Sequence, residues 1–171
     1  MFEISVLTFN DLKEFKEMGF EGFKSISELF QSSSTLPDEQ GVYCILTPIN
    51  GICNFLEVGC GGHFKGKNPN VSLQELKRNW VLGSQVIYIG KAGGEGRKST
   101  LRTRLRQYLK FGHGKPVGHW GGRLIWQIQN SSDLIVCWKS LPSQEPREYE
   151  AELIRHFVSR FGQRPFANFT D

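Results

Sequence analysis

Short apolar runs alternate with amphipathic segments along this 171-residue chain, a pattern that predicts a mixed α+β fold. Three buried strands are expected, at 41–47, from Val86 onward and at 134–138, because β-branched and aromatic residues fill these runs. The first of them, Gly-Val-Tyr-Cys-Ile-Leu-Thr, is apolar on both faces. This favours a sheet that is covered by helices on both sides, an α/β sandwich.

Amphipathic periodicity and capping residues predict helices between these strands. They are expected at 12–18, 72–80, 101–111 and 143–161, with one or two further helical turns at 25–30. Residues 19–23, which contain two glycines, are predicted to form a turn. The run 123–129 is compatible with either a helix or a strand.

Composition changes along the chain and suggests a domain organisation. Residues 1–40 are expected to form an N-terminal helical cover on a main domain at 41–171, in which 48–84 is an insertion between the first two core strands. The Gly-rich basic stretch 61–67 makes this insertion either a functional loop or a small lid. No apolar run is long enough to span a membrane and Met1-Phe2-Glu3 does not begin a signal peptide, so we expect a cytoplasmic protein without a membrane partner.

The four cysteines form no Cys-x-x-Cys pair. Cys44 and Cys137 lie in apolar runs and are interpreted as small core residues. Cys53, Cys60 and His63 could in principle hold zinc, but a fourth ligand is missing.

Charge is strongly segregated along the chain. The whole protein carries 21 Lys and Arg against 17 Asp and Glu, but the window 91–123 alone holds nine basic residues and one acid. Its net charge of +8 leaves −4 for the rest of the chain. Such a distribution is typical of a surface that binds a polyanion, and the alternative is a solvated basic helix.

Two helices carry polar residues beside their apolar stripes. On the helix at 101–111, Arg104 lies one turn before Tyr108 at the edge of the stripe. On the last helix, Glu150 shares a stripe with Ile154 and Phe157. A carboxylate in such a position needs a neutralising partner, which is either a metal ion or a base such as Arg104.

These residues, taken in order, resemble the motifs of the GIY-YIG nuclease family. The matching motifs are Gly41-Val42-Tyr43, Tyr88-Ile89-Gly90-Lys91, Leu101-x-x-Arg104-Leu105-x-x-Tyr108, Glu150-x-x-Leu153-Ile154 and Asn168. The helix with Arg104 and Tyr108 is similar to that of the excision-repair member. The resemblance implies a small three-stranded antiparallel sheet flanked by helices. The two tyrosine motifs lie 45 residues apart here, whereas the family usually places them about ten apart.

The resemblance also implies an activity, the hydrolysis of DNA phosphodiester bonds by an endonuclease that uses Mg²⁺ or Mn²⁺. Glu150 would hold the metal, Arg104 would stabilise the transition state, and Tyr88 would be the base, with Tyr43 as the alternative. The remaining catalytic positions have supporting roles: Tyr43 and Tyr108 orient water and phosphate, Lys91 supplies positive charge, and Asn168 holds the site together by hydrogen bonds.

DNA is the expected partner, and the basic window together with the Gly-rich run after it would contact it. The candidate contacts are Arg97, Lys98, Arg102, Arg106, Lys110, His113, Lys115, His119 and Trp120. The two histidines are alternatively proton relays, and Trp120 is alternatively a structural anchor. The sequence leaves open whether a homodimer or a partner protein directs the protein to its DNA target. The alternative function is a catalytically silent nucleic-acid-binding module with the same fold.

Overall fold

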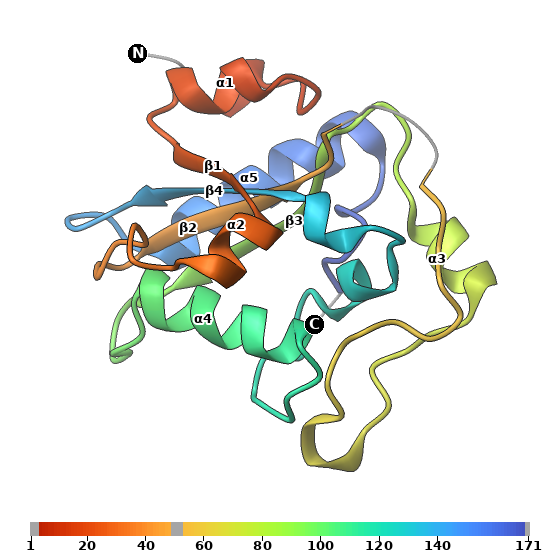
Figure 1. Cartoon of the computed structure of the whole chain (residues 1–171). Helices are drawn as coiled ribbons and strands as arrows, with labels where there is room; N and C mark the ends of the chain where they lie inside the picture. Colours follow the sequence, from red (N-terminus) through yellow and green to blue (C-terminus); the bar gives the residue numbers. More distant parts are fainter. Residues whose placement is uncertain (1–3, 49–52, 170–171) are drawn as a thin grey trace.

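The computed structural model describes residues 4–48 and 53–169, which form a mixed α+β fold. The strands β1 (Glu21–Ser25), β2 (Gly41–Leu46), β3 (Val86–Ala92) and β4 (Ile135–Ser140) form one antiparallel sheet in the order β1-β4-β2-β3. The α-helices of these residues are α1 (Leu12–Glu17), α2 (Ile26–Gln31), α3 (Leu73–Asn79), α4 (Leu101–Gly112) and α5 (Pro146–Phe161). Figure 1 shows α1 and α5 on one face of the sheet and α2 and α4 on the other.

Strand β2 lies at the centre of the fold and is buried along its whole length. Successive side chains of a strand point to opposite faces of the sheet. Tyr43 and Ile45 therefore join the core cluster that includes α2 and α4, whereas Val42, Cys44 and Leu46 join the cluster that includes α1 and α5. This confirms the prediction that helices cover the sheet on both faces.

The predicted helices are confirmed, with small shifts at their ends. The largest shift is at α5, which begins at Pro146 rather than Ser143. Glu145 accounts for it, because its side chain accepts a hydrogen bond from the Arg147 N–H and so caps the helix. The ambiguous run 123–129 contains a short 3₁₀ helix, η3 (Arg123–Gln127).

The expected three-stranded sheet is wrong, because residues 21–25, which overlap the predicted turn at 19–23, form a fourth strand. This strand pairs with β4, and the pairing is shifted between Gly22 and Lys24. A Cβ at Gly22 would lie 2.4 Å from the Trp138 ring, so glycine lets the backbone cross that ring. The N-terminal region is thus part of the sheet as well as a helical cover.

The insertion between β2 and β3 is described from residue 53 onward. It contains the 3₁₀ turn η2 (Phe64–Gly66) at its tip and the helix α3, and Phe55 forms an isolated bridge with Ile128. The expectations for residues 1–3, 49–52 and 170–171 lie outside the described residues. Among the helices of the described residues, none is both long and apolar enough to cross a membrane.

Two of the four cysteines are core residues, as the sequence predicted. Cys44 and Cys137 are buried and lie opposite each other in the β2–β4 register. In the described part of the chain, no three His, Cys, Asp or Glu side chains gather as a metal site would require. The zinc alternative for Cys53, Cys60 and His63 therefore has no support.

Candidate functional site

A pocket of about 200 Å³ gathers polar side chains at the β3 edge of the sheet. Its lining residues are Tyr43, Tyr88, Lys91, Gly93, Arg97, Ser99, Arg104, Gln107 and Glu150. Five of the seven predicted catalytic residues thus lie around one hollow. Gln107 was missed from the sequence, although its position three residues after Arg104 places both on one helix face.

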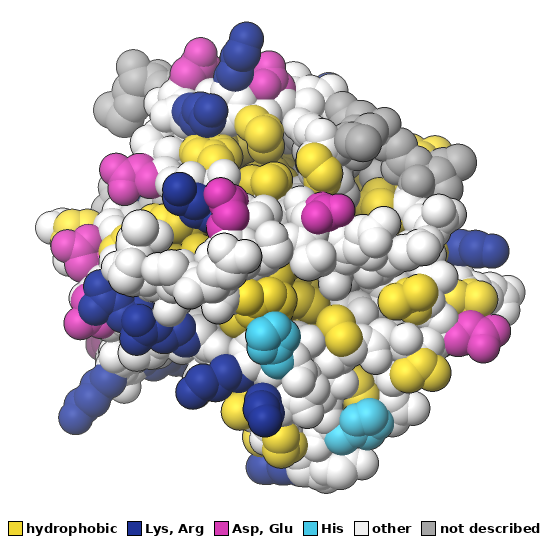
Figure 2. Space-filling model, viewed as in Figure 1, with side chains coloured by type: hydrophobic (Ala, Val, Ile, Leu, Met, Phe, Trp, Pro, Cys, Tyr) yellow, Lys and Arg dark blue, Asp and Glu magenta, His cyan; other side chains and the backbone are white. Residues whose placement is uncertain are grey.

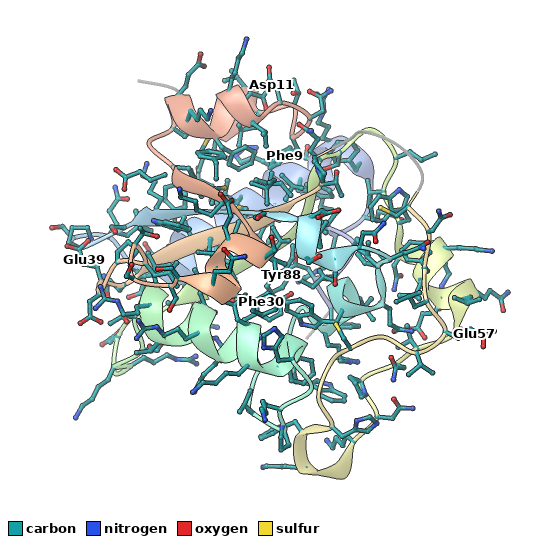
Figure 3. All side chains as sticks on the ribbon, viewed as in Figure 1. Phe9, Asp11, Phe30, Glu39, Glu57 and Tyr88 are labelled. Atoms are coloured by element: carbon teal, nitrogen blue, oxygen red, sulfur yellow. The ribbon has the colours of Figure 1, made fainter. Side chains whose placement is uncertain are left out.

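The two tyrosines of the pocket are brought together by strand pairing. In the β2–β3 register Tyr43 lies opposite Gly90, and a Cβ at this glycine would be 2.5 Å from the tyrosine ring. Glycine therefore makes room for Tyr43 to reach Tyr88, and their ring centroids are 6.0 Å apart. Figure 3 labels Tyr88, which lies between the sheet and α4.

Burial controls the protonation of both phenols. Desolvation raises the pKa of Tyr88 to about 12 and that of Tyr43 well above its usual value, while Arg104 lowers the pKa of each. Tyr88 is 7% exposed and Tyr43 only 1%, so Tyr88 is the more accessible phenol.

The carboxylate of the pocket is already paired. Glu150 Oε2 lies 2.9 Å from Lys91 Nζ, and both side chains are partly exposed. The base that neutralises Glu150 is therefore Lys91, and the sequence alternative of a bridge to Arg104 is wrong. The pair joins α5 to β3 across one face of the sheet, and both of its members line the pocket.

Arg104 has a different kind of partner. Its Nη1 donates a hydrogen bond of 3.2 Å to the carbonyl oxygen of Gly118, and no ion pair involves it in the described part of the chain. A backbone carbonyl carries no full charge. The guanidinium therefore retains its positive charge for an anion that enters the pocket.

His119 lies behind the tyrosines, and its predicted contact with DNA is wrong because the side chain is fully buried. Its ring stacks on Tyr108 at 4.0 Å. Nδ1 lies 2.9 Å from the Gly121 carbonyl oxygen, which accepts only, so Nδ1 carries the hydrogen. Nε2 then accepts a hydrogen bond of 3.1 Å from the Tyr43 hydroxyl.

Burial and the nearby Arg104 charge lower the pKa of His119 to about 3. The imidazole is therefore neutral at physiological pH and is a poor final acceptor for a proton. This argues against the proton-relay alternative for His119. Its role is to fix the direction of the Tyr43 hydroxyl hydrogen, which leaves the lone pairs of that oxygen for the pocket side.

Tyr108 does not reach the pocket, so the expectation that it orients water and phosphate is wrong. Its buried hydroxyl donates a hydrogen bond to the Gly122 carbonyl oxygen. A Cβ at Gly122 would lie 2.6 Å from that hydroxyl, which shows how closely this loop approaches the tyrosine. Tyr108 therefore supports His119 and Tyr43 from behind.

Asn168 also lies outside the pocket, and it acts on the strand that carries Tyr88. Its side-chain amide accepts a hydrogen bond from the Ile89 N–H and donates one to the Ile89 carbonyl oxygen, at 2.9 and 2.8 Å. This agrees with the sequence expectation that Asn168 holds the site together by hydrogen bonds. The amide fixes β3 at the residue next to Tyr88.

Two arginines of the basic window lie on the far side of α4 from the pocket. At 100° per residue, Arg102 and Arg106 are each about 160° from Arg104 around the helix. Arg102 donates to the Leu36 carbonyl oxygen, and Arg106 donates to the Ser33 hydroxyl. Both arginines therefore help to anchor the segment before β2, and their predicted contacts with DNA would lie on the flank of α4 away from this pocket.

Two aromatic rings at and beyond the end of α4 already contact other side chains. The ring of His113 stacks on Phe30 with centroids 3.7 Å apart. Trp120 is partly buried, and the Arg123 guanidinium lies 4.3 Å from its ring. Trp120 is thus the structural anchor that the sequence left as an alternative, rather than a free platform for a base.

The other basic residues keep their side chains in solvent. Arg97 lines the pocket from the Gly-rich link before α4, and Lys98 follows it in the same exposed link. Lys110 and Lys115 are exposed at and beyond the end of α4. The structure therefore leaves these four residues available to a polyanion.

One side chain of the pocket lining, Glu150, could hold a divalent cation. Mg²⁺ is usually held by one or two carboxylates, with water and substrate phosphate completing its shell. Glu150 supplies one carboxylate at the pocket wall.

Comparison with protein families, with curated proteins and with solved structures finds no match to this chain.

Proposed function

We propose that this pocket hydrolyses phosphodiester bonds and that the protein is a divalent-metal-dependent DNA endonuclease. More particularly, we propose that it is a nuclease of the GIY-YIG type, with the second tyrosine motif displaced by the insertion. The observation that carries this proposal is the convergence of two phenols, a guanidinium and a carboxylate on one pocket of about 200 Å³. A pocket of this size has room for a phosphate group.

Each side chain has one task in this proposal. Glu150 holds Mg²⁺ or Mn²⁺, which when bound supplies Lewis-acid stabilisation of phosphate charge. Arg104 donates hydrogen bonds to the phosphate oxygens as their negative charge grows. Tyr88 takes a proton from the attacking water, and Tyr43 orients that water through its oxygen lone pairs.

The raised pKa of Tyr88 leads to a pH prediction. Below its pKa of about 12, the phenolate fraction of Tyr88 grows tenfold with each pH unit. We expect kcat/KM to rise by close to one order of magnitude per unit between pH 7 and 9, as measured with a short duplex at saturating Mg²⁺. The Tyr88→Phe variant should lose this dependence together with most of the activity. A flat wild-type profile would remove Tyr88 as the base.

One observation favours the alternative of a non-cleaving nucleic-acid-binding module. The ion pair between Lys91 and Glu150 neutralises the carboxylate without a metal. In a module that only binds, this pair would be permanent, and Mg²⁺ would have no effect. In the nuclease, Glu150 would exchange its pairing with the Lys91 ammonium for a bound divalent cation.

A supercoiled-plasmid assay separates the two functions. The nuclease converts supercoiled plasmid to relaxed or linear DNA when Mg²⁺ is present and leaves it intact in EDTA. The binding module retards the plasmid in both conditions and cuts it in neither. Absence of cleavage with either Mg²⁺ or Mn²⁺, by protein that is folded and binds the plasmid, would refute the nuclease proposal.

A further inference from the structure

The tip of the insertion packs against the segment that follows α4. The Gly62 N–H donates a hydrogen bond of 2.8 Å to the Phe111 carbonyl oxygen. A Cβ at Gly62 would lie 2.0 Å from the Lys115 carbonyl oxygen, so the two backbones touch and only glycine fits. Segments that are about fifty residues apart in the sequence thus share one surface.

This shared surface is basic. It carries four exposed lysines, which we call the tip surface: Lys65, Lys67, Lys110 and Lys115. No Asp or Glu occurs in residues 58–74 or 96–132, which supply both segments. Figure 2 shows Lys, Arg and His side chains where the tip and the segment after α4 lie in Figure 1, without acidic side chains beside them.

The tip surface is connected to the pocket through Gly118. A Cβ at this glycine would lie 3.5 Å from Phe64 Cζ at the insertion tip. The carbonyl oxygen of the same glycine accepts the hydrogen bond from Arg104 Nη1. Gly118 therefore lies between the guanidinium in the pocket and Phe64, the residue that precedes Lys65.

We propose that the tip surface binds the DNA backbone on one side of the phosphate held in the pocket, so that the insertion is part of the DNA-binding surface. This inference rests on the proposed function, because it takes its substrate from it. Lysines that pair with phosphates release counterions, and each contact adds about 0.9 to the salt slope of binding. The tip surface therefore contributes to affinity and salt dependence, and the pocket supplies the chemistry.

The test removes the two lysines of the insertion and measures binding. The variant is Lys65→Asn with Lys67→Gln, because Lys65 has a φ of 52° and asparagine tolerates that conformation. Binding of a fluorescent DNA duplex is measured in EDTA over a series of salt concentrations. We expect affinity to fall on the order of tenfold and the salt slope to fall by about two.

Two further variants make the result specific. Lys110→Gln with Lys115→Gln removes the same charge from the other segment of the tip surface, and we expect the same loss. Lys13→Gln with Lys16→Gln removes an equal charge from α1, on the opposite face of the sheet, and should bind as the wild type does. Thermal unfolding of each variant checks that the fold is retained.

The outcomes separate this inference from the proposed function. Unchanged affinity and salt slope in both tip-surface variants would overturn the inference, whether or not the wild type cleaves plasmid. A tip-dependent loss of binding in a protein that never cleaves would support the tip surface and refute the nuclease. Failure of the wild type to bind DNA would overturn both.

Discussion

Glu150→Gln is expected to reduce metal-dependent cleavage by about three orders of magnitude or more, since a catalytic metal supplies several kcal/mol of transition-state stabilisation. The amide keeps the size of the side chain but loses the charge that a divalent cation requires. The initial rate of plasmid nicking at saturating Mg²⁺ measures the loss. Calorimetry with Mg²⁺ alone should show binding to the wild type and none to the variant.

The matched control is Glu152→Gln, which removes the same charge two residues further along α5. Its carboxylate lies beside His156 rather than in the pocket, so its rate should stay within a factor of two of the wild type. DNA binding in EDTA should not weaken in Glu150→Gln, because the substitution removes a negative charge beside Lys91. Full cleavage by Glu150→Gln would remove the metal assignment.

Arg104→Ala is expected to lower kcat by about 10²–10³-fold at saturating metal and DNA, the usual cost of losing one preorganised donor to a developing anion. Arg104→Lys should recover only a small part of this rate. A lysine keeps the charge but not the planar fork that lets one nitrogen bind Gly118 while others face phosphate. Single-turnover rates of duplex cleavage measure the effect.

Arg106→Gln is the control for Arg104, because it removes the same charge from the opposite side of α4. Its partner is Ser33, so we expect a small loss of thermal stability and a normal cleavage rate. A near-normal rate in Arg104→Ala would contradict the transition-state role. Equal losses in both variants would point to general electrostatics rather than to the pocket.

Helical periodicity in the sequence predicted where several residues of the candidate site lie. It placed Glu150 on a stripe that faces the protein, and it placed Arg104 at the edge of its helix beside Tyr108. The structure brings Glu150 and Arg104 to one pocket with the two strand tyrosines. Periodicity also implied that Arg102 and Arg106 point elsewhere, but it did not show that backbone and hydroxyl groups of the segment before β2 already bind them.

Other features depended on long-range contacts that local sequence does not encode. The two glycines of residues 19–23 predict a turn, yet pairing with β4 makes 21–25 a strand. His119 lies in a Gly-rich run that is typical of an exposed loop, and only the tertiary structure shows it stacked on Tyr108. Lys91 as the partner of Glu150 likewise follows from the packing of α5 on β3.

The amide of Asn168 has a consequence for how copies of the protein meet. Strand β3 is the outermost strand on its side of the sheet, and such strands offer unpaired N–H and C=O groups to any other extended chain. Asn168 occupies both groups of Ile89, as a neighbouring peptide would. Asn168, which fixes the strand that carries Tyr88, thereby also opposes edge-to-edge pairing of this strand with another chain.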